Sequence, residues 1–168
     1  MSADFLAAVE DQLPLLTILA ALGCGLMAGV FFAFSTFVMK ALARLPLGEG
    51  ISAMQSINVT VINPWFLGVF LLTAADCVLL AVVSLQRWED RGALYLLSGG
   101  ALYFVGTFLV TLIFNVPKNK ALAALSRADP RGATLWPHYF SSWTAWNHVR
   151  TAAALAAAAV FTVALMQG

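Results

Sequence analysis

Long apolar runs divide the chain into four segments, separated by short polar stretches. The runs cover about residues 15–39, 64–85, 93–114 and 147–166. Each run is near the roughly 20 apolar residues that a helix needs to cross a bilayer. Because no water is present in the hydrocarbon core, a spanning segment must satisfy its backbone hydrogen bonds within a helix. The pattern predicts an all-α protein, an integral membrane four-helix bundle that forms a single domain over residues 1–168.

The connection between the first two runs is amphipathic. Residues 50–62 carry apolar side chains at roughly helical spacing, but the stretch is too short and too polar to span a membrane. We therefore expect an interfacial helix here. Asn63-Pro64 then starts the second span, because proline suits the first turn of a helix.

The third connection, residues 118–146, is too long to lack structure in a compact chain. We expect an interfacial helix over residues 118–125 and a short helical piece after Asp129-Pro130. A further start at Pro137 is expected to continue as one helix to Met166.

The composition agrees with a membrane protein, since 61% of the residues are apolar and only 10% are charged. The net charge is +1 and there is no basic block, so nucleic acid is not an expected partner and membrane lipids are. Basic residues of the connections fall mainly on one side of the predicted bundle. That side carries Lys40, Arg44, Lys118, Lys120, Arg127, Arg131 and Arg150, and the other carries Arg87 and Arg91. The positive-inside rule makes the richer side cytoplasmic, with both termini outside, in a bacterial inner membrane.

Gly25 and Gly29 form a GxxxG pattern in the first run, which lets another helix approach closely. The favoured neighbour is a helix of the same chain. The alternative is a second subunit, in a homo-oligomer assembled through these two glycines.

A polar and aromatic stripe opens the fourth run. Trp143, Trp146, Asn147 and Arg150 stand at i, i+3, i+4 and i+7, so a helix places them on one face. Contact with lipid alone would favour leucine and valine at these positions. The competing interpretation is that the tryptophans belong to the interfacial aromatic belt and that Arg150 extends to lipid phosphates.

Asparagines from other segments favour a pocket over that competing interpretation. Asn58, Asn63, Asn115 and Asn119 are expected at the same cytoplasmic end of the bundle, in greater number than helix capping requires. We expect the substrate-binding residues to be Asn58, Asn63, Asn115, Asn119, Trp143 and Trp146.

The catalytic candidates are Asn147, His148 and Arg150. An imidazole titrates near neutral pH and suits a general base, and a guanidinium can stabilise an anion. However, His148 and Arg150 point about 160° apart on a regular helix, so the residue that faces the pocket is undecided. The chain has two histidines, ten positions apart, and no ligand spacing typical of a metal site. We expect no cofactor, with a haem held by His148 alone as the less favoured alternative.

Asp76 is the sole carboxylate within an apolar run, which makes it a functional candidate. We favour a packing role for it, through a hydrogen bond with Tyr103 or Thr107. A proton relay is the alternative.

Several motifs, taken in this order, resemble the anthrone oxygenase family of small four-helix membrane proteins. They are Gly25 to Ser35, Met54 to Asn58, Asn63-Pro64, Phe114 to Asn119, and Trp143 to Thr151. The resemblance covers residues 15–166, and the motifs are more specific as a set than alone. It implies the four-helix fold and, more loosely, the oxidation of anthrones to anthraquinones by O2 without a dedicated metal or flavin.

The function that we expect is a cofactor-independent oxygenase acting on an apolar aromatic substrate that is anthrone-like or hydroquinone-like. His148 would remove a ring proton, and Arg150 and the asparagine amides would hold the resulting anion. The alternative is a non-catalytic membrane protein that binds a lipid, a quinone or a partner helix at the same end. A transporter ranks third, because one intramembrane charge and four spans would require oligomerisation.

Overall fold

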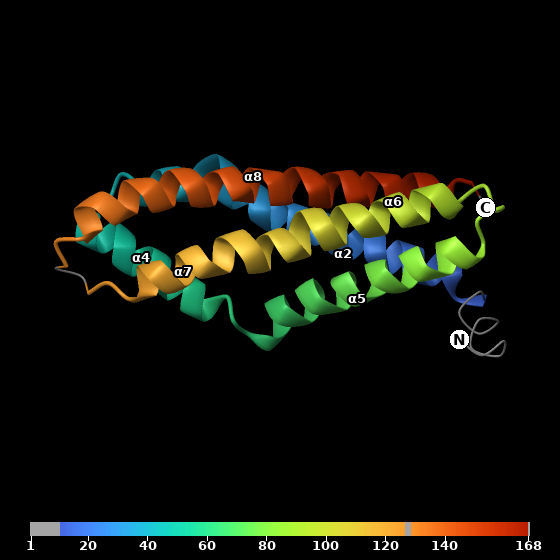
Figure 1. Ribbon diagram of the computed structural model, residues 1–168, viewed down its shortest axis with the longest axis horizontal. Helices are drawn as coiled ribbons and strands as arrows, with labels where there is room; N and C mark the ends of the chain where they lie inside the picture. The colour runs from blue at the N-terminus through green and yellow to red at the C-terminus, as the bar shows by residue number, and fades with distance from the viewer. Residues whose placement is uncertain (1–10, 127–128, 168) are drawn as a thin grey trace.

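The structure is a computed structural model that describes residues 11–126 and 129–167 (Figure 1). The described residues are helical and contain no strand, which confirms the all-α prediction. Four continuous helices are long and apolar enough to cross a membrane, as expected of an integral membrane protein. In chain order the elements are α2 (Leu13–Ala33), η1 (Phe34–Val38), α3 (Met39–Leu42), α4 (Leu47–Thr60), α5 (Pro64–Gln86), α6 (Ala93–Tyr103), η2 (Phe104–Leu109), η3 (Thr111–Asn115), α7 (Val116–Ala123) and α8 (Gly132–Leu165).

The third connection differs from its prediction in two ways. Residues 118–123 belong to α7, which continues the third long helix from α6 without a break, rather than forming a separate interfacial helix. The last helix begins at Gly132 and passes through Pro137 instead of starting there. A proline six residues into a helix removes one backbone hydrogen bond. Buried Trp136 and Tyr139, on either side of it, pack in the core beside α4 and α7, which favours continuing the helix.

The helices differ in length, and this difference shapes the bundle. At 1.5 Å per residue, α5 is about 35 Å long, whereas α8 is about 51 Å long. Figure 1 shows α4 at the end of the bundle, beyond the start of α5. One hydrophobic core therefore joins α2, α5, α6 and α8, and a second joins α3, α4, α7 and α8. The prediction of a helix before Asn63 holds, and its place at a membrane interface remains a prediction.

Asn63 explains where α5 begins. Its Oδ1 accepts hydrogen bonds from the backbone N–H groups of Trp65 (3.1 Å) and Phe66 (3.0 Å), and Pro64 occupies the first turn. These contacts satisfy donors that a helix start leaves without intrahelical partners.

Gly25 and Gly29 do not pack against another helix in the described part of the chain. Both are exposed, and a Cβ atom at either would meet nothing within 4 Å. The expectation of intrachain packing is therefore wrong for these two glycines. A close helix contact lies instead at Gly100, where a Cβ would stand 2.5 Å from the Cys77 carbonyl oxygen. Assembly of copies through Gly25 and Gly29 remains a prediction.

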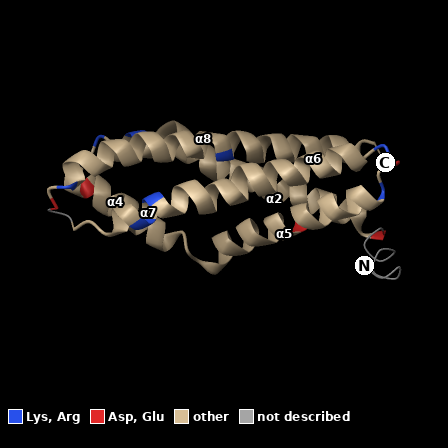
Figure 2. Ribbon diagram, viewed as in Figure 1, with Lys and Arg blue, Asp and Glu red and all other residues tan. Residues whose placement is uncertain are grey.

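Charged residues gather mostly at the two ends of the bundle, as Figure 2 shows. Arg150 departs from the predicted distribution, because it is only 4% exposed and lies within the bundle rather than in a connection. Arg127, one of the charges used to predict orientation, lies outside the described residues. The orientation in the membrane remains a prediction.

Asp76 does not pair with Tyr103 or Thr107. The Tyr103 hydroxyl donates to the Phe70 carbonyl (3.4 Å), and the Thr107 hydroxyl donates to the Arg150 carbonyl (3.2 Å). Asp76 Oδ1 is buried without a hydrogen-bond partner among the described residues. The expected packing bond is therefore wrong, because both hydroxyls are engaged by backbone carbonyls.

Candidate functional site

A cavity of about 680 Å³ lies between the helices, next to the junction of α4 and α5. Its walls come from α2, α4, α5, the α6–α7 helix and α8. Most of the lining is apolar, with aromatic rings from Phe31, Phe34, Phe66, Phe70, Phe108 and Trp143. The polar lining residues are Gln55, Asn58, Thr111, Asn119, Lys120 and Arg150. The lining thus carries two cationic side chains and, among the described residues, no carboxylate and no imidazole.

Arg150 is the central polar group of this cavity. Its Nη1 donates to Thr111 Oγ1 (3.1 Å) and its Nη2 to Asn147 Oδ1 (2.6 Å). The guanidinium carbon lies 4.2 Å from the ring centroid of Phe31 and 5.1 Å from that of Trp143. Nε has no partner, and no carboxylate of the described residues forms an ion pair with this side chain. A buried cation without a counter-ion is costly, so the site is suited to an anionic group.

Asn147 positions Arg150 from the side of the guanidinium that faces away from the cavity lining. It is fully buried, and its Nδ2 donates to the Phe31 carbonyl and to Ser35 Oγ, each at 2.7 Å. Its Oδ1 is left to accept the hydrogen bond from Arg150. Asn147 does not line the cavity. It joins α8 to the first long helix and holds the guanidinium in one orientation.

Three wide π-helical turns supply hydroxyl groups around Arg150. Ser35 lies in η1, Thr107 in η2 and Thr111 in η3. A π turn adds a residue to the helical repeat and is frequent at functional sites. Pro117 follows η3 and has no N–H to offer the carbonyl of the preceding turn, which favours a wider turn there. The sequence prediction did not place these hydroxyls in the site, and their only signal was a polar residue within an apolar run.

Asn119 holds two aromatic residues of α8. Its Oδ1 accepts hydrogen bonds from the Tyr139 hydroxyl (2.9 Å) and from Trp143 Nε1 (2.8 Å). Asn115 Nδ2 donates to the Trp143 carbonyl (3.2 Å), so Trp143 is held at both its backbone and its ring. Asn115 Oδ1 is buried without a partner. Tyr139 also escaped the sequence prediction.

Four of the residues expected in the site line the cavity: Asn58, Asn119, Trp143 and Arg150. The other five, Asn63, Asn115, Trp146, Asn147 and His148, do not line it. Asn63 is engaged in the cap of α5, and Trp146 stacks on Phe114 with ring centroids 3.6 Å apart. Asn115, at the end of η3, is buried against α8 and does not line the cavity. The structure therefore brings together only part of the predicted set.

His148 is exposed and does not line the cavity. It follows Asn147 directly, and Asn147 faces the first long helix, so the imidazole projects from another face of α8. A general base at this position would have to act from outside the cavity. Among the described residues, no cluster of three histidine, cysteine, aspartate or glutamate side chains could hold a metal ion.

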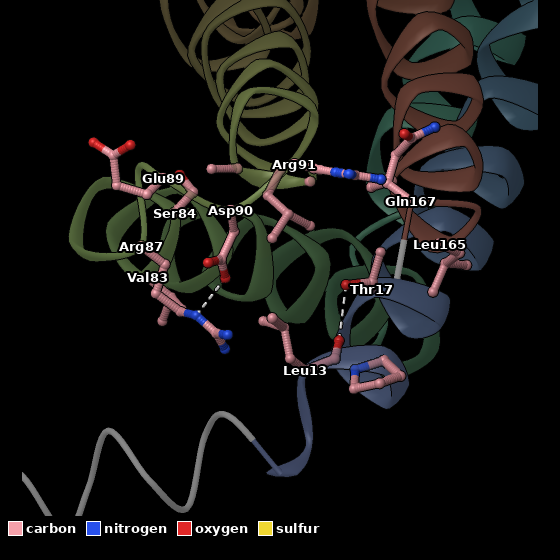
Figure 3. Close-up of a pocket in the computed structure, with 15 residues that line it drawn as sticks. Leu13, Thr17, Val83, Ser84, Arg87, Glu89, Asp90, Arg91, Leu165 and Gln167 are labelled. Carbon is pink, nitrogen blue, oxygen red and sulfur yellow. Dashed lines mark hydrogen bonds and ion pairs between the residues drawn. The ribbon is translucent and has the colours of Figure 1, made fainter.

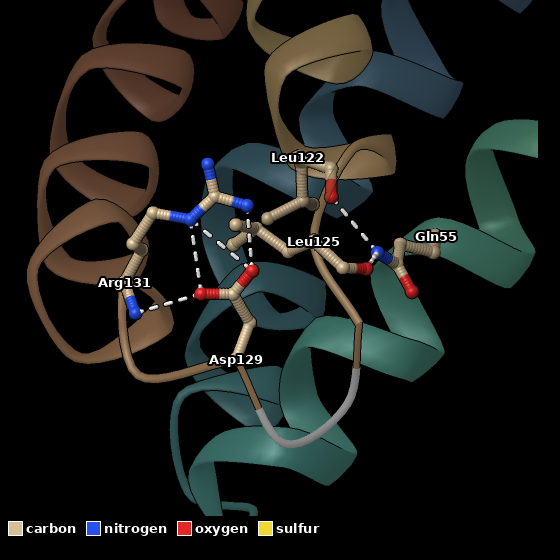
Figure 4. A network of polar contacts seen from close by, with 5 residues as sticks. All are labelled: Gln55, Leu122, Leu125, Asp129 and Arg131. Atoms are coloured by element: carbon tan, nitrogen blue, oxygen red, sulfur yellow. Dashed lines mark hydrogen bonds and ion pairs between the residues drawn. The ribbon is translucent and has the colours of Figure 1, made fainter.

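The end of the bundle next to the cavity is closed by polar contacts between α4 and α7 (Figure 4). Gln55 Nε2 donates to the carbonyls of Leu122 (2.8 Å) and Leu125 (2.9 Å). Nearby, Arg131 Nη2 lies 2.7 Å from Asp129 Oδ2. The hydrogen bonds from the Arg131 side chain and backbone hold the pKa of Asp129 below its ordinary value.

A second cavity, of about 650 Å³, lies at the opposite end of the bundle (Figure 3). It is lined by the α5–α6 turn and the ends of α2 and α8. Arg87 Nε pairs there with Asp90 Oδ2 at 2.7 Å. None of the residues expected in the site lines this cavity.

The anthrone oxygenase family model matches residues 61–160 of the chain. No curated protein and no solved structure matches the chain. The matched residues include Thr111, Asn119, Trp143, Asn147 and Arg150, whereas Asn58 and the GxxxG glycines lie before them. By this match, which spans more than half of its length, the chain belongs to the anthrone oxygenase family.

Proposed function

We propose that the protein is a membrane-embedded, cofactor-independent oxygenase for an apolar aromatic substrate that is anthrone-like or hydroquinone-like. Family membership supports this activity, and the cavity supports the substrate class. A volume of about 680 Å³ suits a small molecule, and the aromatic walls suit a fused-ring system. The observation that carries the proposal is Arg150, a buried cation that faces this cavity without a carboxylate partner among the described residues.

The proposed chemistry uses Arg150 to stabilise a substrate anion. When the methylene carbon of an anthrone loses a proton, the negative charge moves largely onto the carbonyl oxygen, where a guanidinium can hold it. The electron-rich carbon then forms a bond with one oxygen atom of O2. Cleavage of the O–O bond, with loss of the second methylene hydrogen, leaves a carbonyl group and releases the other oxygen atom as water.

The described residues that line the cavity offer no carboxylate or imidazole base. The site therefore acts by lowering the pKa of the bound substrate, and water accepts the proton. Asn147 positions the guanidinium, and Trp143 and Phe31 hold it between aromatic faces. His148 has no part in this mechanism. We propose that the reaction needs no cofactor. Absorbance of the purified protein in the Soret region tests the alternative of a bound haem.

Oxygen uptake by the purified protein in detergent, supplied with an anthrone, tests this function. We expect uptake of one O2 for each anthraquinone formed, at a rate well above that of empty detergent micelles. Uptake no faster than in empty micelles, across several anthrones and hydroquinones, would contradict the proposal. Saturable binding of the same compounds without uptake would instead favour a non-catalytic protein that binds a quinone-like ligand.

A further inference from the structure

We infer that Asn119 and Gln55 form a hydroxyl-recognition site in the cavity, so the ligand carries a ring hydroxyl in addition to the oxygen held by Arg150. The inference rests on the proposed function for its fused-ring ligand. It concerns the α4–α7 wall, to which the oxygenation chemistry assigns no role.

The orientation of the Asn119 amide follows from its partners. An indole N–H can only donate, so the Asn119 atom that lies 2.8 Å from Trp143 Nε1 must be the oxygen. The Tyr139 hydroxyl donates to the same oxygen. Nδ2 of Asn119 has no partner among the described residues, and Asn119 lines the cavity. The side chain therefore offers hydrogen-bond donors to a ligand.

The Gln55 amide is fixed in the opposite sense. The atom that lies 2.8 Å and 2.9 Å from two backbone carbonyl oxygens must be the nitrogen, since carbonyls only accept. Figure 4 shows the Gln55 nitrogen turned toward Leu122 and Leu125. Its oxygen accepts no hydrogen bond from the described residues, and Gln55 also lines the cavity. This side chain therefore offers an acceptor.

The donor and the acceptor belong to one wall of the cavity. Gln55 bonds to the carbonyl of Leu122, and Asn119 precedes Leu122 by three residues on α7, so both side chains belong to the α4–α7 wall of the cavity. A phenolic hydroxyl satisfies both groups, because its oxygen accepts from Asn119 while its hydrogen is donated to Gln55. A methoxy group or a ring carbonyl can use Asn119 only.

Trp143 sets the spacing between this pair and Arg150. The guanidinium carbon lies 5.1 Å from the Trp143 ring centroid, and the N–H at the edge of the same indole contacts Asn119. Arg150 and Asn119 therefore both contact Trp143, the first over its ring and the second at its N–H. A fused-ring aromatic compound can present an oxygen at Arg150 and a hydroxyl on a neighbouring ring.

Three non-reactive ligands test the inference without turnover: a hydroxyanthraquinone, its methyl ether and unsubstituted anthraquinone. Quenching of tryptophan fluorescence in the full-length protein gives each dissociation constant. Two added hydrogen bonds correspond to about tenfold tighter binding of the hydroxy compound than of the unsubstituted one, with the ether in between. Equal affinity of the wild-type protein for all three ligands would overturn the inference, whatever any variant does.

Asn119→Asp isolates the donor. The aspartate can still accept from Tyr139 and Trp143, so these contacts remain while the donor to the cavity is lost. We expect the methyl ether to lose its advantage over unsubstituted anthraquinone, because a carboxylate cannot donate to the ether oxygen. Asn63→Asp is the matched control, since it adds the same charge outside the cavity and an aspartate also caps a helix. An unchanged advantage of the methyl ether over unsubstituted anthraquinone in a folded Asn119→Asp variant would contradict the inference.

The two proposals fail separately. Hydroxyl preference without oxygen uptake would remove the oxygenase function and leave the recognition site in place. Oxygen uptake without hydroxyl preference would remove only the recognition site.

Discussion

Arg150 and His148 are two residues apart on α8, yet only Arg150 enters the cavity. The guanidinium of Arg150 is buried and bonded to Thr111 and Asn147, whereas the His148 side chain is exposed and lines no cavity. The separation follows from the helical repeat, which turns residues two apart to nearly opposite sides. The described lining of the cavity therefore holds a buried cation and no histidine.

Arg150→Gln is expected to lower kcat/KM for oxygen uptake about 10²- to 10³-fold, because one buried cationic donor to the developing oxyanion is lost. Arg150→Lys should be nearly as slow, since an ammonium lacks the planar fork that reaches Thr111 and Asn147 together. Arg131→Gln, at an exposed arginine outside the cavity, is the matched control. Wild-type rates in a folded Arg150→Gln variant would refute the assigned role.

His148→Ala is expected to leave kcat within about twofold of wild type, because a surface substitution away from the site changes little. The measurement is the same oxygen uptake, with the thermal midpoint recorded to confirm folding. A loss of tenfold or more at unchanged thermal stability would restore His148 as a catalytic base and contradict the placement of the site.

Gly100→Ala should destabilise the protein by about 1–3 kcal/mol through overpacking. The new Cβ would stand 2.5 Å from the Cys77 carbonyl oxygen, and a backbone atom of a facing helix cannot easily yield. Gly25→Ala is the control, because its Cβ meets nothing within 4 Å and alanine favours the helix. Thermal unfolding in detergent compares the two. Equal midpoints for both variants would show that α5 and α6 pack less closely than described.

Asp129→Ala should lower the thermal midpoint slightly at neutral pH and have no effect in acid. Arg131 holds the pKa of Asp129 below its ordinary value in the folded state. The pair therefore stabilises the fold above the unfolded-state pKa, and this contribution is lost as the pH falls through the lowered value. Unfolding midpoints of both proteins across this range provide the test, and added salt should shrink the difference at neutral pH. A difference that grows in acid would have the wrong sign.

The sequence alone was sufficient for the class of the fold and for the helix that carries the site. Four apolar runs require spanning helices, because backbone groups in hydrocarbon have no other partners. The spacing of Trp143, Asn147 and Arg150 places them on one helical face, and the structure buries all three. Local periodicity is a property of the chain itself, so these features could be predicted without a neighbouring helix.

The tertiary structure decided which side chains meet. A helix has several faces, and only its packing against other helices determines which face borders a cavity. That packing turns Arg150 inward and His148 outward, engages Asn63 in a cap, and leaves Gly25 exposed. It also brings Gln55, Thr111 and Tyr139 to the site or its border from separate segments. These contacts join residues far apart in the chain. They depend on how the helices pack, with α5 in one hydrophobic core and α4 in the other, and a local sequence pattern does not determine that packing.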